Sequence, residues 1–176
     1  MSFFAPEFEG QLTVDRLPDD FTARLQHRVE QGLLVPGKRK RANYKVRSMD
    51  GSAIRFSAEG LLTTYAVGLN DVTVCRSGRN QVQYQVTYWG WTMAAVVHGL
   101  LLGVVLVAGY LFVPEVARDL QKYSNGSATF LDMVVFWSLM WPWILSRIHR
   151  PFARRAIERI LRETLVSTPE EHRRAA

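Results

Sequence analysis

The sequence predicts an α+β cytoplasmic domain, an antiparallel β-meander with one or two amphipathic helices, followed by a two-helix transmembrane hairpin. Short segments of alternating polarity, separated by turn residues, precede the apolar region, and this pattern is typical of antiparallel strands. Two long apolar runs come next, and a basic amphipathic segment follows them. We therefore expect a domain over residues 1–90, a hairpin over 91–146, and a basic cytoplasmic helix and tail over 147–176.

The segment Gln81–Trp89 (QVQYQVTYW) has the clearest strand pattern. Its valine and tyrosine residues alternate with glutamine and threonine, so one face of the strand is apolar and the other polar. Similar segments, separated by turn signals, are expected to form further strands. They are FEGQLTV (8–14), ANYKVRS (42–48), SAIRFSA (52–58), LTTYAV (62–67) and VTVCRS (72–77). The expected order of elements is one strand, one helix and a five-strand meander.

One amphipathic helix is expected over residues 19–33. Apolar residues recur there at the i, i+4 spacing of a single helix face. They are Phe21, Leu25, Val29 and Leu33. Pro18 suits the first turn of a helix, and the acidic residues Asp19 and Asp20 favour the positive end of its dipole.

Two apolar runs predict membrane spans. Residues 92–113 include no Lys, Arg, Asp or Glu, and about 20 apolar residues are enough to cross a bilayer. The second run, residues 130–146, is shorter and holds Asp132 near its start. A turn-rich loop over residues 114–129 joins the two runs, so they are expected to form an antiparallel pair with that loop on the outer side of the membrane.

Basic residues set the expected orientation. The N-terminal 91 residues hold twelve Lys or Arg, and eight arginines follow Leu145. The loop holds only Arg118 and Lys122, balanced by two acidic residues. The positive-inside rule therefore predicts a two-pass protein of the cell inner (plasma) membrane with both termini in the cytoplasm.

Tryptophans are expected to mark one membrane face as an aromatic belt. Two lie at the start of the first span and two at the end of the second, namely Trp89, Trp91, Trp141 and Trp143. Aligning the two pairs places Val134 level with His98. Pro142 predicts a kink or an early helix end near the last of these tryptophans.

His98 lies inside the first apolar run, where an imidazole must be neutral or find a partner. We expect it to form an interhelical hydrogen bond with Asp132 or Ser138, the nearest polar side chains in the expected alignment. A proton or ligand site built on His98 and Asp132 is the alternative, and His98 could also pair across a homodimer. Beside His98, three small residues repeat every four positions and predict a helix-packing face. They are Ala95, Gly99 and Gly103.

The segment after the second span, residues 149–166, is a second amphipathic helix with an apolar stripe among arginines. Two sites compete for that stripe. It could lie on the bilayer interface, with its arginines among headgroups. It could instead fold back onto the open face of the sheet as a second layer, which we favour because a five-strand meander needs more cover than one helix provides.

One basic run stands out in the domain, Lys38, Arg39, Lys40 and Arg41. A solvated loop or a topogenic signal explains it without any ligand. Among ligands, anionic lipid headgroups are favoured over nucleic acid, because the expected strand at Gln81–Trp89 leads almost directly into the membrane.

No motif for nucleotide binding, a metal site or a catalytic nucleophile occurs in the sequence. Cys75 is the only cysteine, which excludes an internal disulfide and a cysteine metal cluster. We expect no cofactor, no metal and no independent enzyme activity. The favoured function is a non-catalytic accessory or scaffold protein that presents its domain to a protein partner or a second copy. An anionic-lipid-binding module and a redox or proton-handling subunit using His98 are the alternatives.

Overall fold

The computed structural model describes residues 6–34 and 43–166. The chain divides into two compact units, one made of Met1–Gly90 with Arg150–Ala176 and the other of Trp91–His149. The first unit holds a five-stranded antiparallel sheet with helices, and the second holds two long apolar helices. The α+β character of the domain and the presence of two long apolar helices are therefore confirmed.

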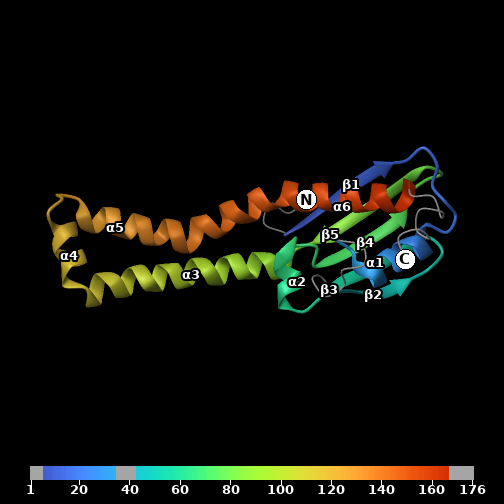
Figure 1. Ribbon diagram of the computed structural model, residues 1–176. Coiled ribbons are helices and arrows are strands. Elements are labelled where there is room, and N and C mark those ends of the chain that lie inside the picture. Colours follow the sequence, from blue (N-terminus) through green and yellow to red (C-terminus); the bar gives the residue numbers. More distant parts are fainter. Residues whose placement is uncertain (1–5, 35–42, 167–176) are drawn as a thin grey trace. The chain divides into compact units, whose positions relative to one another are not determined.

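Each strand of the sheet is antiparallel to its neighbours, in the order β1-β5-β4-β3-β2 (Figure 1). The strands are β1 (Glu7–Thr13), β2 (Asn43–Met49), β3 (Ala53–Glu59), β4 (Asp71–Arg76) and β5 (Gln81–Thr87). The meander β2–β5 follows the chain, and β1 joins its far edge beside β5. The helix α1 (Phe21–Gly32) connects the two edge strands β1 and β2.

Local signals shape the meander as the sequence indicates. In β5, Val82, Tyr84 and Val86 are buried while the residues between them are exposed. Between β2 and β3, the Asp50 carboxylate accepts hydrogen bonds from the backbone N–H groups of Ser52 and Ala53 at 2.7 and 2.6 Å. These bonds stabilise the hairpin turn, and the one from Ser52 contributes most to lowering the pKa of Asp50.

The segment LTTYAV was expected to be a strand, and this prediction is wrong. It forms most of the helix α2 (Leu61–Ala66), which begins after Gly60 at φ +82°. The strands on either side, β3 and β4, pair directly with each other. The segment is therefore excluded from the sheet, and its six residues close one helical turn between two neighbouring strands.

Two helices cover one face of the sheet. Figure 1 shows α1 and the C-terminal part of α6 (Trp141–Val166) over the strands. Helix α1 buries Phe21, Leu25 and Val29, and the strands that it contacts, β2 and β3, bury Tyr44 and Phe56. The matching residues of α6 are Ala153, Ile157, Ile160, Leu161 and Leu165, all of them buried. The apolar stripe of the last helix thus lies on the sheet, the arrangement we favoured from the sequence.

Gly10 of β1 provides room for a large side chain of the neighbouring strand. It is directly opposite Tyr84 in the register of β1 and β5. A Cβ atom at Gly10 would overlap the Tyr84 hydroxyl and lie 2.8 Å from Cε2 of its ring. The Tyr84 ring therefore lies across the backbone of β1 at the one position without a side chain.

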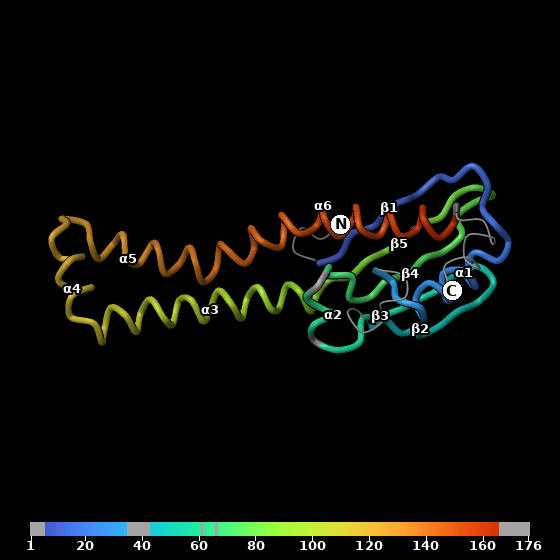
Figure 2. The backbone as a smooth tube through the Cα atoms, viewed as in Figure 1, coloured from blue at the N-terminus to red at the C-terminus, as the bar shows by residue number. Residues whose placement is uncertain are grey.

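The second unit contains two helical segments joined by a short third helix. Helix α3 (Trp89–Phe112) contributes its residues from Trp91 onward. The short α4 (Pro114–Gln121) follows, and then α5 (Gly126–Val135), the π-helical turn η2 (Phe136–Met140) and the start of α6. Figure 2 shows the path from α5 into α6 as one continuous helical course. Residues 114–129, expected to be a turn-rich loop, are thus largely helical.

Helix α4 forms because its ends carry suitable residues. Pro114 occupies the first turn, where a missing N–H costs nothing, and its ring presets the helical φ angle. Glu115 lies in the first turn and Arg118 in the last, and both complement the helix dipole.

Pro142 does not end the second long helix, because the turn before it accommodates the proline. It cannot donate a backbone hydrogen bond to the preceding turn. The π-helical turn η2 directly precedes it, and the Trp141 N–H donates to the carbonyl of Phe136, five residues back. This wider turn changes the hydrogen-bond pattern before the proline and lets the helix continue to Val166.

Candidate functional site

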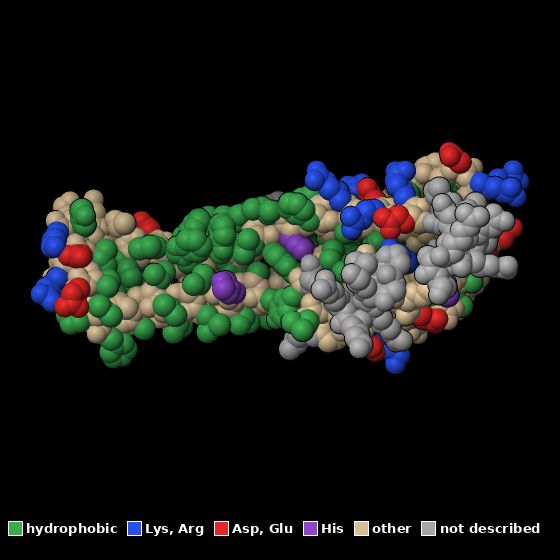
Figure 3. Space-filling model, viewed as in Figure 1, with side chains coloured by type: hydrophobic (Ala, Val, Ile, Leu, Met, Phe, Trp, Pro, Cys, Tyr) green, Lys and Arg blue, Asp and Glu red, His purple; other side chains and the backbone are tan. Residues whose placement is uncertain are grey.

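The helix pair of the second unit has an apolar exterior. Two helices, Trp89–Phe112 and Gly126–Leu165, are long and apolar enough to cross a membrane by length and composition. Helix α3 buries only small residues, while Leu101, Val104 and Val105 are exposed. Hydrophobic side chains cover much of the helix pair in Figure 3. The pair is compatible with a two-pass membrane protein.

The two helices meet at a seam of small residues. Ala95, Gly99 and Gly103 are the buried residues of α3. A Cβ at Gly99 would overlap Pro142 and lie 2.8 Å from the carbonyl oxygen of Trp137. A Cβ at Gly103 would likewise overlap the hydroxyl of Ser138. The glycines therefore allow backbones to approach closely, as small residues do between apolar helices.

The ends of the same helix pair are joined by aromatic stacking. Trp91 stacks on His149 with ring centroids 4.1 Å apart, and Tyr110 stacks on Phe130 at 4.7 Å. Thr92 shares a hydrogen bond of 3.1 Å with Ser146. Together with the glycine contacts, these pairs define an antiparallel register.

That register differs from the one expected from the tryptophan pairs. Alignment of the tryptophans placed Val134 level with His98, whereas Pro142 lies against the adjacent Gly99. The physical reason is that close contact at the glycines and stacking of Trp91 on His149 set the alignment. The tryptophans are not paired at equal depth.

The register also separates the polar residues that were expected to meet. The side chain of His98 is exposed, although its neighbour Gly99 is buried. Ser138 contacts Gly103, five residues farther along α3, and Asp132 is exposed on α5. In the described parts of the chain, no cluster of three His, Cys, Asp or Glu could hold a metal ion. The register does not bring His98 and Asp132 together, so a proton or ligand site on that pair stays a prediction.

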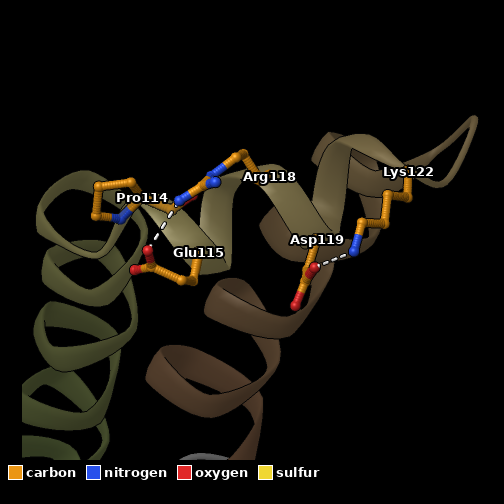
Figure 4. Close-up of polar contacts among 5 residues, drawn as sticks. All are labelled: Pro114, Glu115, Arg118, Asp119 and Lys122. Carbon is orange, nitrogen blue, oxygen red and sulfur yellow. Dashed lines mark hydrogen bonds and ion pairs between the residues drawn. The ribbon is translucent and has the colours of Figure 1, made fainter.

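The connection between the two helices carries paired charges. In Figure 4, Arg118 contacts Glu115 at 2.8 Å, and Lys122 forms an ion pair with Asp119. The Arg118 side chain also donates to the carbonyl oxygen of Pro114. These pairs lie at i, i+3 spacing on one helical turn each, so the two basic charges of the segment are neutralised locally.

The second face of the sheet is polar, and in the described segments no helix covers it. Exposed glutamines and glutamates of the adjacent strands β1 and β5 line it, namely Glu7, Glu9, Gln11, Gln81, Gln83 and Gln85. Half-buried Thr73 and Cys75 of β4 continue this face. Two contacts organise its surface: Gln11 donates to Gln81 at 2.8 Å, and Arg55 forms an ion pair with Asp71. We call this surface the polar sheet face.

Two polar contacts hold α6 to the rest of the domain. The Tyr84 hydroxyl donates to Glu158 at 2.6 Å, and Arg154 donates to the same carboxylate at 3.0 Å. Arg28 of α1 is buried and forms an ion pair of 3.1 Å with Glu163. Burial lowers the pKa of the Arg28 guanidinium, and the nearby Glu163 carboxylate partly offsets this decrease.

These contacts and α2 were not identified from the sequence. The alternation in the sequence places Tyr84 on the apolar face of a strand, and Glu158 and Glu163 lie on the charged side of an amphipathic helix. Neither pattern shows which residue each of them contacts. For α2, the one signal in the sequence is the pair of neighbouring leucines at 61 and 62, which breaks the strict alternation of a strand. The basic run Lys38, Arg39, Lys40 and Arg41 lies outside the described residues.

Comparison with known proteins returns no relative: the chain matches no protein-family model, no curated protein and no solved structure.

Proposed function

We propose that the protein is a two-pass protein of the cell inner membrane that acts as a non-catalytic accessory or scaffold protein. Its α+β domain presents the polar sheet face to a protein partner in the cytoplasm. The observation that carries this proposal is the asymmetry of the domain. One face of the sheet is covered by two helices, and the other exposes an ordered polar surface.

The exterior of the helix pair supports membrane insertion. If the helix pair were in water, exposed side chains such as those of Leu101 and Val104 would be hydrated. The free-energy cost of that exposure is about 25 cal/mol for each Å² of apolar surface. A bilayer removes that cost, and helices satisfy their backbone hydrogen bonds internally. Lipid is therefore the environment that suits the exposed apolar surface.

Charge supports the proposed orientation. The loop between the helices has no excess of basic residues, and its two cations are paired with carboxylates. The segments before and after the helix pair are rich in Lys and Arg. The positive-inside rule then places the loop outside the membrane and the domain in the cytoplasm.

The polar sheet face supports a protein partner. An antiparallel sheet is stable with one face in water, so this face needs no further layer for folding. Its amide side chains offer donors and acceptors together, and its strands hold them in a regular array. Such a surface suits a reversible contact with another polar protein surface.

Photo-crosslinking in the full chain, expressed in its own membrane, tests the proposal. A photoreactive amino acid is placed at Gln83 or Gln85 on the polar sheet face, and at Glu30 on the exposed side of α1 as the matched control. We expect discrete products from the two sheet positions and none from Glu30. A product of twice the chain mass would identify a second copy as the partner. Absence of any product at both sheet positions, or identical products at Glu30, would refute the proposal.

A further inference from the structure

Helix α2 displays the most exposed large apolar side chain in the described parts of the chain. Leu62 is 85% exposed, and Tyr65 on the same short helix is 43% exposed. The two residues are three positions apart and so share one face of the helix. On the other side, Thr63 is buried and accepts a hydrogen bond from the backbone N–H of Asn43 at 3.1 Å. Helix α2 therefore faces the domain with a threonine and faces outward with leucine and tyrosine.

The same helix packs against Gly90, the second residue of α3. A Cβ at Gly90 would overlap the Thr64 side chain and lie 3.2 Å from the Asn70 side-chain oxygen. Asn70 in turn donates from its side chain to the carbonyl of Thr64 at 2.9 Å, and its backbone N–H donates to Thr87 at 3.1 Å. These contacts lie within the domain and place α2 against Gly90, the last residue of the domain before the chain continues along α3.

A further exposed aromatic residue, Trp89, lies at the chain junction next to Gly90. It is the first residue of α3, directly before Gly90, and it is 55% exposed. Leu62 and Tyr65 form an apolar patch on the outer face of α2, which we call the α2 patch. Helix α2 carries no charged residue, so moving its outer face out of water costs no charge desolvation.

We propose that the α2 patch inserts into the headgroup and acyl-chain boundary of the membrane that α3 enters. The inference rests on the proposed function, because it requires α3 to cross a bilayer. Lipid is favoured as the occupant because α2 packs against Gly90, from which the chain continues into the apolar helix. The exposed aromatic residues at this end of the domain, Tyr65 and Trp89, are of the two types typical of membrane interfaces. Leu62 supplies apolar surface, and the Tyr65 hydroxyl remains able to bond with headgroups or water.

Lipid quenching of a fluorophore on the full chain tests the inference. The Cys75→Ser chain carries one new cysteine, labelled with an environment-sensitive dye, in vesicles of phosphatidylcholine and phosphatidylglycerol. Some of the lipid carries a nitroxide quencher near the top of the acyl chain. Leu62→Cys and Tyr65→Cys probe the α2 patch. Met49→Cys is the matched control, because Met49 is 46% exposed on β2, beside the hairpin at the end of the sheet remote from α2.

We expect quenching at Leu62 and Tyr65 to be several-fold stronger than at Met49. A third site, Val104→Cys on the exposed side of α3, reports on the span itself. Quenching at Val104 without quenching at the two α2 sites would overturn the inference and leave the two-pass proposal standing. No quenching at Val104 would overturn the two-pass proposal and this inference with it.

Discussion

The Tyr84 hydroxyl donates a hydrogen bond of 2.6 Å to the Glu158 carboxylate, and this contact joins an inner strand of the sheet to the last helix. Burial, with help from Glu158, raises the pKa of Tyr84 to about 12. In the other direction, the hydrogen bond from Tyr84 lowers the pKa of Glu158. The pair therefore keeps a neutral phenol and an ionised carboxylate together over a wide pH range.

Replacement of Tyr84 by Phe is expected to reduce the free energy of unfolding by about 1–2 kcal/mol at pH 7, because a hydrogen bond to a charged group is lost. The folded pKa of Glu158 lies below the ordinary glutamate value of about 4.5 that applies in the unfolded chain. The stabilisation is therefore complete above that value and disappears as the pH falls through the folded pKa.

Denaturant unfolding of the full chain in detergent, followed from pH 7 down to pH 3, measures this difference. The exposed Tyr65→Phe variant is the control and should match the parent chain. A Tyr84→Phe deficit that stays constant across the whole range would show that packing and not Glu158 ionisation is responsible.

Gly10→Ala is expected to destabilise the domain by about 1–3 kcal/mol, because the added methyl group must displace the buried Tyr84 ring. Gly51→Ala is the matched control, since a Cβ there meets nothing within 4 Å. Thermal unfolding of both variants compares the two positions. Equal stability of the two variants would mean that β1 moves aside without cost.

In the helix pair, Gly99→Ala is expected to weaken packing by about 1–3 kcal/mol, because the carbonyl of Trp137 lies within 2.8 Å of the new Cβ. Gly109→Ala on the same helix meets nothing within 4 Å and should be neutral. Thermal unfolding in detergent gives the stability of each variant. A disulfide between cysteines at Thr92 and Ser146 should form less completely in the Gly99→Ala chain. Equal disulfide formation in both variants would contradict the proposed role of Gly99.

Glu163→Gln is expected to cost about 1–2 kcal/mol, because it leaves the buried Arg28 charge without a carboxylate. The cost is below that of a fully buried pair because the Glu163 side chain is 51% exposed and water screens it. Among the described residues, Nε of Arg28 already lacks a hydrogen-bond partner. Chemical denaturation of this variant is compared with that of Glu30→Gln, a matched change on the exposed side of α1. Equal losses of unfolding free energy in the two variants would argue against a role for the burial of Arg28.

The proposed orientation predicts the reactivity of cysteines placed on the two sides of the membrane. In a Cys75→Ser chain, Ser124→Cys lies in the connection between α4 and α5 and should react with an impermeant thiol reagent in intact cells. Ser52→Cys lies in the β2–β3 turn and should react only after the cells are opened. The reverse pattern would invert the topology.

Local pattern was sufficient for most elements of the fold. The alternation in β5 and the i, i+4 spacing in α1 predicted both elements and the faces they bury. The same reasoning identified Ala95, Gly99 and Gly103 as one helix face. It failed for α2, because six residues fit either period and the deciding fact is that β3 pairs directly with β4.

The sequence by itself determined the two apolar helices, the strand faces and the charge imbalance, because each depends on neighbouring residues or on composition. Only the tertiary structure decided that β1 lies beside β5, that the last helix covers the sheet, and that the helix register follows glycines and not tryptophans. Each outcome depends on contacts between residues far apart in the chain, and those that hold the last helix, Tyr84 with Glu158 and Arg28 with Glu163, join residues 74 and 135 positions apart. Contacts between residues so distant in the chain leave no periodic pattern in the sequence from which they could be predicted.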